Sequence, residues 1–332
     1  MSQLRLNPLN GRWVTVVAER AERPTDFAPR NRQVEAEPLN PCPFCPGNEE
    51  STPPALETYG RDGRWVVRIV PNRYPAFYGD DPLAVRNLGP VHVQAPASGI
   101  HEVLVFSPQH GASWADLDDR DAGLVMAALR DRVEEHARTP NIRYTQAIVN
   151  HGREAGASLS HPHGQLLGMP FVPGEILDEE RAFARFEGGC ILCATIEAEV
   201  TDGSRVVHDD DRVVIVCPFW AGSPYELLVI PRTHDAHLQD SAPADLAAVG
   251  RSVRDALESM RRLLGDVSYN LVFHTAPHRH NGPFHWHAHI WPKLVSIAGF
   301  ERGTGVLINI VPPEFSAQEL RKVGATPASS AV

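Results

Sequence analysis

Two stretches of the chain, HPHGQ at residues 161–165 and HWHAH at residues 285–289, decide the fold. The same series of features precedes each of them: a Cys-x-x-Cys pair, an apolar strand that ends in a proline and a histidine, and an amphipathic helix followed by a strand. The histidine of FSPQH lies 51 residues before HPHGQ, and that of IPRTH lies 51 residues before HWHAH. Ordered motifs at a fixed spacing are the signature of a repeated structural unit. The sequence therefore predicts a tandem duplication.

Each copy is predicted to contain several strands and one long helix. Short apolar runs indicate strands, and apolar residues at helical intervals indicate helices. The expected strands are 11–18, 64–70, 101–107 and 143–149 in the first copy and 212–217, 225–230 and 268–274 in the second, and the expected helices are 114–138 and 242–264. We expect an α+β fold of antiparallel sheets with helices packed on them. The predicted domains are residues 1–175 and 176–332.

Composition limits the class of protein. The chain has 332 residues, of which 42% are hydrophobic and 22% charged, so it can bury a sizeable core. The formal charge is −10 and no basic stripe stands out, so no nucleic-acid partner is expected. No apolar run reaches the roughly 18 residues of a membrane-spanning helix. The first residues also lack the apolar segment of a signal peptide, and we expect a cytoplasmic protein with no membrane partner.

Cysteines and histidines form a metal-binding pattern in both copies. Without a secretory signal, a Cys-x-x-Cys pair favours half of a zinc site over a disulfide. Structural zinc takes four ligands in a tetrahedron, commonly two cysteines and two histidines. The first copy offers Cys42, Cys45, His110 and His161, and the second offers Cys190, Cys193, His234 and His285. We predict two zinc ions per chain; the alternative is that the thiols are free and the histidines merely polar.

Other histidines leave the second metal site open. His274, His287 and His289 compete with the second set for a metal. The remaining candidates have no such support and are expected to be solvated or incidental: His101, His151, His278 and His280.

The HPHGQ motif also has the pattern of a nucleophile for phosphorus. In an extended segment, residues two apart face the same side, so His161, His163 and Gln165 share one face. A neutral imidazole attacks phosphorus, and a carbonyl that accepts its Nδ1–H aims Nε2 outward. The Gln165 amide can donate to a phosphoryl oxygen on which charge builds, but it cannot protonate a leaving group. We predict that His163 is the nucleophile; the alternative is a strand that only completes a zinc site.

With these motifs the chain resembles the histidine-triad superfamily and, more closely, the galactose-1-phosphate uridylyltransferase family. The resemblance covers nearly the whole chain, in the order NPLNGRW (7–13), RAERP (20–24), CPFC, VPNRYP (70–75), FSPQH, HPHGQ, IPRTH and GFERGTG (299–305). It implies ping-pong transfer of a nucleoside monophosphate, with UMP as the expected group, through a nucleotidyl-His163 intermediate. The implied substrates are a nucleotide sugar and a hexose 1-phosphate, of the UDP-glucose plus galactose 1-phosphate type.

The resemblance also implies substrate contacts and an assembly. The matching positions are Phe44 and Asn72 for the nucleoside, Asn150, Ser158 and Gln165 for the phosphates, Arg20 and Arg23 for the nucleotide or sugar phosphate, and Phe300 and Glu301 for the hexose. The last four are expected to come from a partner subunit. The family resemblance therefore implies a homodimer with active sites at its interface.

One departure leaves the substrates open. Uridylyltransferases of the family have a glutamine shortly after the GYE-type motif, where this chain has Leu307. This pattern resembles the ADP-glucose phosphorylase branch, so the alternative is a nucleotide-sugar phosphorylase with phosphate or sulfate as the acceptor. Other members bind a second, iron-type metal through a carboxylate and histidines, which His274, His287 and His289 could mimic here, so the second metal could be iron. An alternative of another class is a non-catalytic nucleotide-binding zinc protein.

The second copy departs from the motif of the first. HWHAH has Trp286 in place of Pro162 and Ala288 in place of Gly164. We therefore expect residues 1–175 to form the catalytic domain and residues 176–332 to form a degenerate copy. Its three alternating histidines nevertheless match the pattern of histidine-triad hydrolases.

Overall fold

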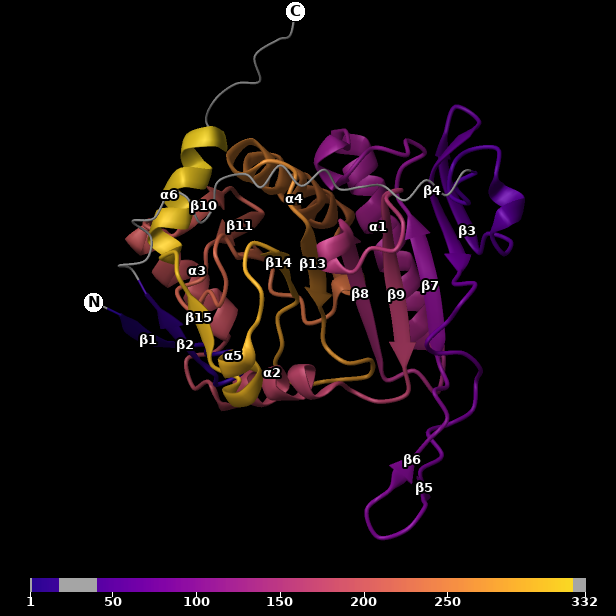
Figure 1. The fold of residues 1–332 in the computed structure, drawn as a ribbon, viewed down its shortest axis with the longest axis horizontal. Helices are drawn as coiled ribbons and strands as arrows, with labels where there is room; N and C mark the ends of the chain where they lie inside the picture. Colours follow the sequence, from indigo (N-terminus) through magenta and orange to yellow (C-terminus); the bar gives the residue numbers. More distant parts are fainter. Residues whose placement is uncertain (1, 18–40, 325–332) are drawn as a thin grey trace, which may run out of the picture.

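One antiparallel sheet of ten strands forms the frame of the molecule (Figure 1). The computed structural model describes residues 2–17 and 41–324. In spatial order the strands are β10 (Val206–Asp209), β11 (Val213–Val216), β12 (Leu227–Pro231), β14 (His287–Pro292), β13 (Tyr269–His274), β8 (Tyr144–His151), β9 (His163–Met169), β7 (Ile100–Val105), β4 (Arg64–Pro71) and β3 (Glu57–Arg61). The predicted α+β class with an antiparallel sheet is confirmed.

The two halves of the sheet repeat each other in strand order. Read outward from the centre, the first half runs β8, β9, β7, β4, β3, and the second runs β13, β14, β12, β11, β10. The halves meet where β8 pairs with β13, with Asn150 opposite Asn270. The predicted duplication is therefore present as two copies of one strand arrangement within a single sheet. The predicted boundary between residues 175 and 176 falls at the start of α2 (Gly174–Arg185) and stays a prediction.

Helices cover both faces of the sheet. α1 (Asp119–Arg138) and α4 (Pro243–Leu264) share one apolar core with strands of both halves. They approach closely at Gly250, where a Cβ would lie 2.6 Å from the carbonyl oxygen of Ala122. On the opposite face of the second half, α2 and α3 (Ile191–Asp202) pack in a separate apolar cluster with β11 and β12.

Helix α1 begins later than the sequence predicts. Ser113 and Asp116 cap a short 3-10 turn, after which Leu117 is extended. The side chain of Asp118 then accepts from the backbone N–H of Asp121 at 2.7 Å and starts the helix proper. The apolar periodicity from residue 114 was continuous, but the two capping carboxylates divide it into a turn and a helix.

The remaining elements lie around this frame (Figure 1). They are a three-stranded sheet of β1 (Gln3–Leu6), β2 (Trp13–Val16) and β15 (Leu307–Asn309), the helices α5 (Gly299–Thr304) and α6 (Pro313–Gly324), and the hairpin of β5 (Arg86–Asn87) and β6 (Val93–Gln94). Among the helices in the described ranges, none has the length and apolarity needed to cross a membrane.

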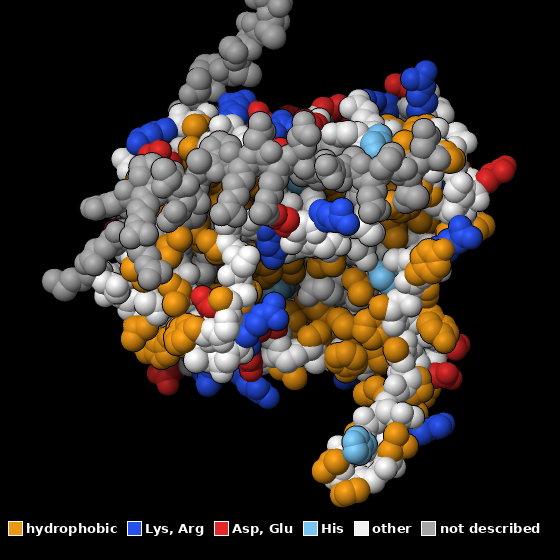
Figure 2. All heavy atoms as spheres, viewed as in Figure 1, with side chains coloured by type: hydrophobic (Ala, Val, Ile, Leu, Met, Phe, Trp, Pro, Cys, Tyr) orange, Lys and Arg blue, Asp and Glu red, His pale blue; other side chains and the backbone are white. Residues whose placement is uncertain are grey.

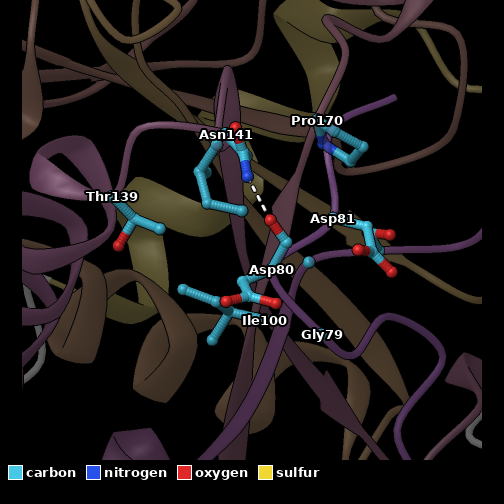
Figure 3. A pocket seen from close by; sticks show the side chains of 10 residues that line it. Gly79, Asp80, Asp81, Ile100, Thr139, Asn141 and Pro170 are labelled. Carbon is cyan, nitrogen blue, oxygen red and sulfur yellow. Dashed lines mark hydrogen bonds between the residues drawn. The ribbon is translucent and has the colours of Figure 1, made fainter. Parts of the chain in front are cut away.

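The hairpin forms an arm that projects from the body (Figures 1 and 2). Its base is closed by a hydrogen bond from the Gly99 N–H to the Gly79 carbonyl at 3.0 Å. The Asn141 side chain also donates to the carbonyl of Asp80, beside a cavity of about 330 Å³ (Figure 3). Several apolar side chains of the arm are exposed, namely Leu83, Val85, Leu88, Val91 and Val93. The arm is thus anchored at its base and presents apolar surface to its surroundings.

Candidate active site and metal clusters

His163 lies at the start of β9, near the centre of the sheet, and its side chain is 7% exposed. Its Nδ1 lies 2.8 Å from the backbone carbonyl oxygen of His161, which can only accept. The proton of the neutral ring is therefore on Nδ1, and Nε2 carries the lone pair. Burial lowers the pKa of His163, with a partial offset from this hydrogen bond. The geometry is that of a neutral imidazole prepared to act as a nucleophile.

Phe44 and Gln165 flank this imidazole. The ring centroids of Phe44 and His163 are 5.5 Å apart, and Phe44 is buried between the two cysteines of the first pair. Gln165 follows His163 by two residues on β9, so the two side chains share a face of the strand. The structure therefore brings these three sequence-predicted residues together.

Asn72 and Asn150 border the same region from neighbouring strands. The Asn72 amide nitrogen and Gln165 Oε1 both contact Nε2 of His101, at 3.1 and 2.8 Å. Val149 pairs with Gly164, and one further step in this register places Asn150 opposite His163. Both asparagines thus lie within the neighbourhood that the sequence predicted for them.

Among the described residues, three other predicted contacts show no hydrogen bond or ring contact with His163, and two further ones cannot be placed. Ser158 is exposed in the connection between β8 and β9. Phe300 and Glu301 lie on α5, beside the small sheet and across the molecule from β7 and β9 (Figure 1). Arg20 and Arg23 lie outside the described residues.

The first predicted zinc ligands form a compact cluster. Cys42, Cys45, His110 and His161 offer ligand atoms that all lie within 4.8 Å of one another. The Cys45 Sγ is 3.4 Å from His110 Nδ1 and 3.6 Å from His161 Nδ1. A tetrahedral zinc ion with ordinary bond lengths has sulfur–nitrogen edges of about 3.6 Å. The donor set and its spacing therefore fit zinc.

The second predicted set has nearly the same geometry. Cys190, Cys193, His234 and His285 also lie within 4.8 Å of one another. The Cys193 Sγ is 3.3 Å from His234 Nδ1 and 3.6 Å from His285 Nδ1. His285 Nε2 donates to the Pro231 carbonyl at 2.9 Å, as His161 Nε2 donates to the Ser107 carbonyl at 2.8 Å. Both histidines therefore present Nδ1 to the cysteines.

A third cluster is separate from the second zinc site, so the three histidines do not compete for that site and instead match the alternative of a carboxylate-and-histidine metal site. His274, His287 and His289 gather instead around Glu179 of α2, and all four side chains are buried. Glu179 Oε1 lies 2.8 Å from His274 Nδ1, whereas Glu179 Oε2, His287 Nε2 and His289 Nδ1 have no hydrogen-bond partner. Unpaired buried polar atoms that converge on one point fit a bound cation. Nitrogen and carboxylate donors suit iron or zinc.

The lowered pKa of Glu179 and its position beside a cavity both fit a role as a ligand of a cation. Burial raises its pKa, but His274 and His287 more than offset this and lower the pKa well below its usual range. The cluster also lies at the wall of a cavity of about 490 Å³, which Glu179, His274 and His289 help to line. The carboxylate is therefore ionised, as a metal ligand must be.

Sequence reasoning missed two residues of these sites. Glu179 belongs to no motif, but it lies on the buried face of α2 with Ile176 and Phe183, and an acid on an apolar face is a usable signal. His101 and His278 are predicted to be solvated or incidental, yet His101 contacts Gln165, and His278 is buried against Thr145 at 2.8 Å. Neither histidine stands in a pattern; the pairing of β7 with β9 places His101 beside Gln165, and His278 reaches Thr145 from the turn after β13.

Comparison with known proteins identifies relatives along the full chain. Residues 1–173 match the model of the galactose-1-phosphate uridyl transferase N-terminal domain, and residues 175–310 match that of its C-terminal domain. ADP-glucose phosphorylase of Arabidopsis thaliana is 32% identical over 98% of this chain and 93% of its own length. A galactose-1-phosphate uridylyltransferase of Thermotoga maritima is 27% identical over 97% of this chain and 98% of its own.

Solved structures show the same relationship. The ADP-glucose phosphorylase of Arabidopsis thaliana with bound ADP-glucose has a TM-score of 0.82 at 30% identity, over 98% of this chain and 100% of that chain. A uridylyltransferase structure has a TM-score of 0.75 at 26% identity, over 98% of each chain. The predicted enzyme class, a nucleotidyltransferase, is confirmed. The chain belongs to the galactose-1-phosphate uridyl transferase family.

Proposed function

We propose that this enzyme transfers a nucleoside monophosphate from a nucleotide sugar to an anionic acceptor, which is a sugar phosphate, phosphate or sulfate, through a covalent intermediate on His163. The observation that carries the proposal is the hydrogen bond from His163 Nδ1–H to the His161 carbonyl. It fixes the tautomer and leaves Nε2 as the nucleophilic atom. Residues 1–175 then form the catalytic domain, and residues 176–332 the degenerate copy.

The reaction has two displacements at the α-phosphorus. In the first, the Nε2 lone pair of His163 forms a bond to phosphorus, and the bond to the bridging oxygen breaks. A hexose 1-phosphate leaves with the electron pair, and it needs no proton because a phosphate is a stable anion. In the second, an oxygen of the acceptor phosphate forms the new bond to phosphorus, and the electron pair returns to Nε2. The His161 carbonyl stabilises the positive charge of the nucleotidyl-imidazole between the two steps.

The proposed substrate contacts divide by chemistry. Gln165, Asn150 and Ser158 donate to the phosphates, where charge builds during each displacement. Phe44 and Asn72 hold the nucleoside, and the Phe44 ring beside His163 also keeps water from the nucleophile. None of these groups is an acid, in keeping with a leaving group that needs no protonation.

We propose zinc for both cysteine clusters and iron or zinc for the Glu179 cluster. Zinc held by Cys42, Cys45, His110 and His161 fixes the backbone around the nucleophile rather than taking part in transfer. Its ligand His161 is also the residue whose carbonyl accepts the Nδ1 proton of His163. The cluster of Cys190, Cys193, His234 and His285 plays the corresponding structural part in the second half.

The proposed assembly is a homodimer with shared active sites. Phe300 is 51% exposed on α5, far from the nucleophile of its own chain (Figure 1). From a partner subunit, Phe300 and Glu301 reach the hexose and Arg20 and Arg23 reach the phosphates. A dimer also gives the exposed apolar arm a surface to cover it. The molar mass measured by light scattering tests the proposal, because a monomer at micromolar concentration contradicts it.

The first proposed substrate pair is UDP-glucose with galactose 1-phosphate. A second candidate is ADP-glucose with phosphate or sulfate, and it is supported by the 32% identity to ADP-glucose phosphorylase. Leu307 favours the second pair, because it stands near the position at which uridylyltransferases of the family have a glutamine. Its apolar side chain lies against Gly222. A neutral apolar residue offers no hydrogen bond to a sugar phosphate.

Labelled substrates test the proposal directly. We expect the α-³²P label of UDP-glucose or ADP-glucose to appear on the protein as an acid-labile, base-stable phosphoramidate in the absence of an acceptor. Adding galactose 1-phosphate or phosphate then releases the label as a new nucleotide product, and the faster acceptor identifies the reaction. Tight nucleotide binding without labelling would instead support the non-catalytic nucleotide-binding alternative.

A further inference from the structure

His101 lies beside the proposed catalytic residues without belonging to any of their motifs. It is the second residue of β7, which pairs with β9. Val103 is directly opposite Gln165 in this pairing, and His101 lies two residues before Val103 on the same strand. Side chains two apart on a strand share a face, so His101 is a diagonal neighbour of Gln165.

A backbone group fixes which nitrogen of His101 carries the proton. The N–H of Ala76 donates to His101 Nδ1 at 3.0 Å. A backbone N–H has no alternative orientation, so Nδ1 must be the acceptor and carries no proton. The neutral ring therefore holds its hydrogen on Nε2, which becomes a donor.

The His101 Nε2–H has one suitable acceptor among its contacts. Gln165 Oε1 lies 2.8 Å away. The Asn72 amide nitrogen lies 3.1 Å away, but Asn72 Oδ1 already accepts from the Tyr74 N–H at 2.8 Å. The side of the Asn72 amide that faces His101 is thus a donor, and it does not compete for the proton. The His101 hydrogen bond therefore goes to the carbonyl oxygen of Gln165.

This bond decides which end of the Gln165 amide meets a phosphate. An amide group can turn over and exchange its oxygen and its NH₂ with little change in shape. With the oxygen held by His101, the NH₂ is the end left to face a ligand, and it has no protein partner among the described residues. With the amide turned over, its oxygen would face the anionic phosphoryl group and repel it.

We propose that His101 is a positioning residue that orients the Gln165 amide so that its N–H groups donate to the transferred phosphoryl group. His101 itself touches no reacting atom. Its neutral Nε2–H works through Gln165, and the anchor is the Ala76 N–H on the loop that follows β4. The inference rests on the proposed function, since it assigns an orientation to a group proposed to stabilise the transition state.

Two conservative variants separate this role from a structural one. The side-chain oxygen of His101→Asn reaches the place of Nδ1, so it keeps the Ala76 contact and loses the donor. The side-chain nitrogen of His101→Gln reaches the place of Nε2, so it keeps the donor. We expect nucleotidyl transfer to fall about tenfold in His101→Asn, as for loss of one hydrogen bond to a transition-state donor, and to stay within about threefold of wild type in His101→Gln. The reverse ranking would show that His101 only anchors the loop, and would overturn the proposal.

A double-mutant cycle adds a second readout. In a Gln165→Ala background, His101→Asn should change the first-order rate of His163 labelling by less than about twofold, because its target is absent. KM for the nucleotide sugar should change less than the turnover number in the single variant. An undiminished tenfold effect in the Gln165→Ala background would overturn the proposal.

Nitrogen-15 NMR of the imidazoles tests the hydrogen bond without turnover. We expect His101 to show a protonated Nε2 and an unprotonated Nδ1 in the wild-type protein, with a changed Nε2 signal in Gln165→Ala. A protonated Nδ1 would overturn the proposal. If the wild-type enzyme labels His163 with neither nucleotide sugar, the proposed function fails by itself, while this measurement still reports on His101.

Discussion

The two halves of the molecule pair corresponding strands in the same register, but these strands carry different side chains. In the second half His274 is paired with His287, as the register places Asn150 opposite His163 in the first. Both central histidines donate Nδ1–H to the carbonyl two residues earlier, at 2.8 Å in the first half and 2.9 Å in the second. The scaffold that aims Nε2 is therefore common to both halves.

The neighbours of that imidazole decide what it can do. In the first half the neighbours are neutral amides, Asn150 and Gln165, which can donate to an anion. In the second half the corresponding places hold His274 and His289, and Glu179 adds a carboxylate. Imidazole nitrogens and a carboxylate attract a cation, so the same strand geometry yields a cluster of residues that could hold a metal. In this fold the backbone carbonyl sets the orientation of the central imidazole, whereas the neighbouring side chains determine whether an anion or a cation can bind beside it.

Replacing the two central histidines gives the largest expected contrast. His163→Ala should lower nucleotidyl transfer by at least about 10³-fold, because the nucleophile is lost. His287→Ala should keep most of the transfer activity and lose the metal of the Glu179 cluster. Steady-state rates and metal content of both variants check this. Comparable losses of activity in the two variants would contradict the proposal that only the first half is catalytic.

The two cysteine clusters give the next contrast. Cys42→Ser and Cys190→Ser should each remove one zinc ion and lower the melting temperature, because structural zinc contributes folding free energy. Only Cys42→Ser should also slow transfer per folded molecule, since the backbone carbonyl of His161 in that cluster accepts the hydrogen bond from His163 Nδ1–H. Cys217→Ser is the matched control, because Cys217 is buried outside all three clusters. Full zinc content in either cluster variant would contradict the assigned ligands.

Making the first half resemble the second is a finer test. Gln165→His places an imidazole where the second half has His289. Transfer should fall by about 10²-fold, as for loss of one transition-state donor. The fraction of the intermediate that reacts with water should rise, because an imidazole can act as a general base. The ratio of free nucleoside monophosphate to transfer product measures this, and an unchanged ratio would limit Gln165 to charge stabilisation.

The smallest expected effect comes from the third cluster. Glu179→Gln should lower the content of the metal proposed for this cluster and lower the melting temperature, while transfer stays within about twofold because the cluster lies in the half proposed to be non-catalytic. Glu197→Gln, at an exposed position on α3, is the control. Elemental analysis of both proteins decides the matter. Equal metal content in the two variants would remove Glu179 from the ligands.

The features that occur in both copies could be predicted from the sequence, whereas contacts that depend on the pairing of distant strands could not. Two ordered sets of motifs were enough to predict the duplication and the clustering of eight cysteine and histidine side chains. Glu179 was missed because it comes from α2, which has no counterpart in the motif series, and the one signal for it was its place on the apolar face of that helix. The contact of His101 with Gln165 joins residues 64 positions apart and exists only because β7 pairs with β9. Spacing along a chain does not encode that pairing.

Because β8 pairs with β13, each half of the sheet covers the central edge strand of the other half. Five residue pairs, from Tyr269 with His151 to Phe273 with Ala147, close the sheet at its centre. A chain cut near residue 175 would leave β8 or β13 as a bare edge with unpaired N–H and C=O groups. Such edges recruit strands from other molecules and lead to aggregation. The second half therefore keeps the central edge of the first half paired, even where its own side chains depart from the HPHGQ motif.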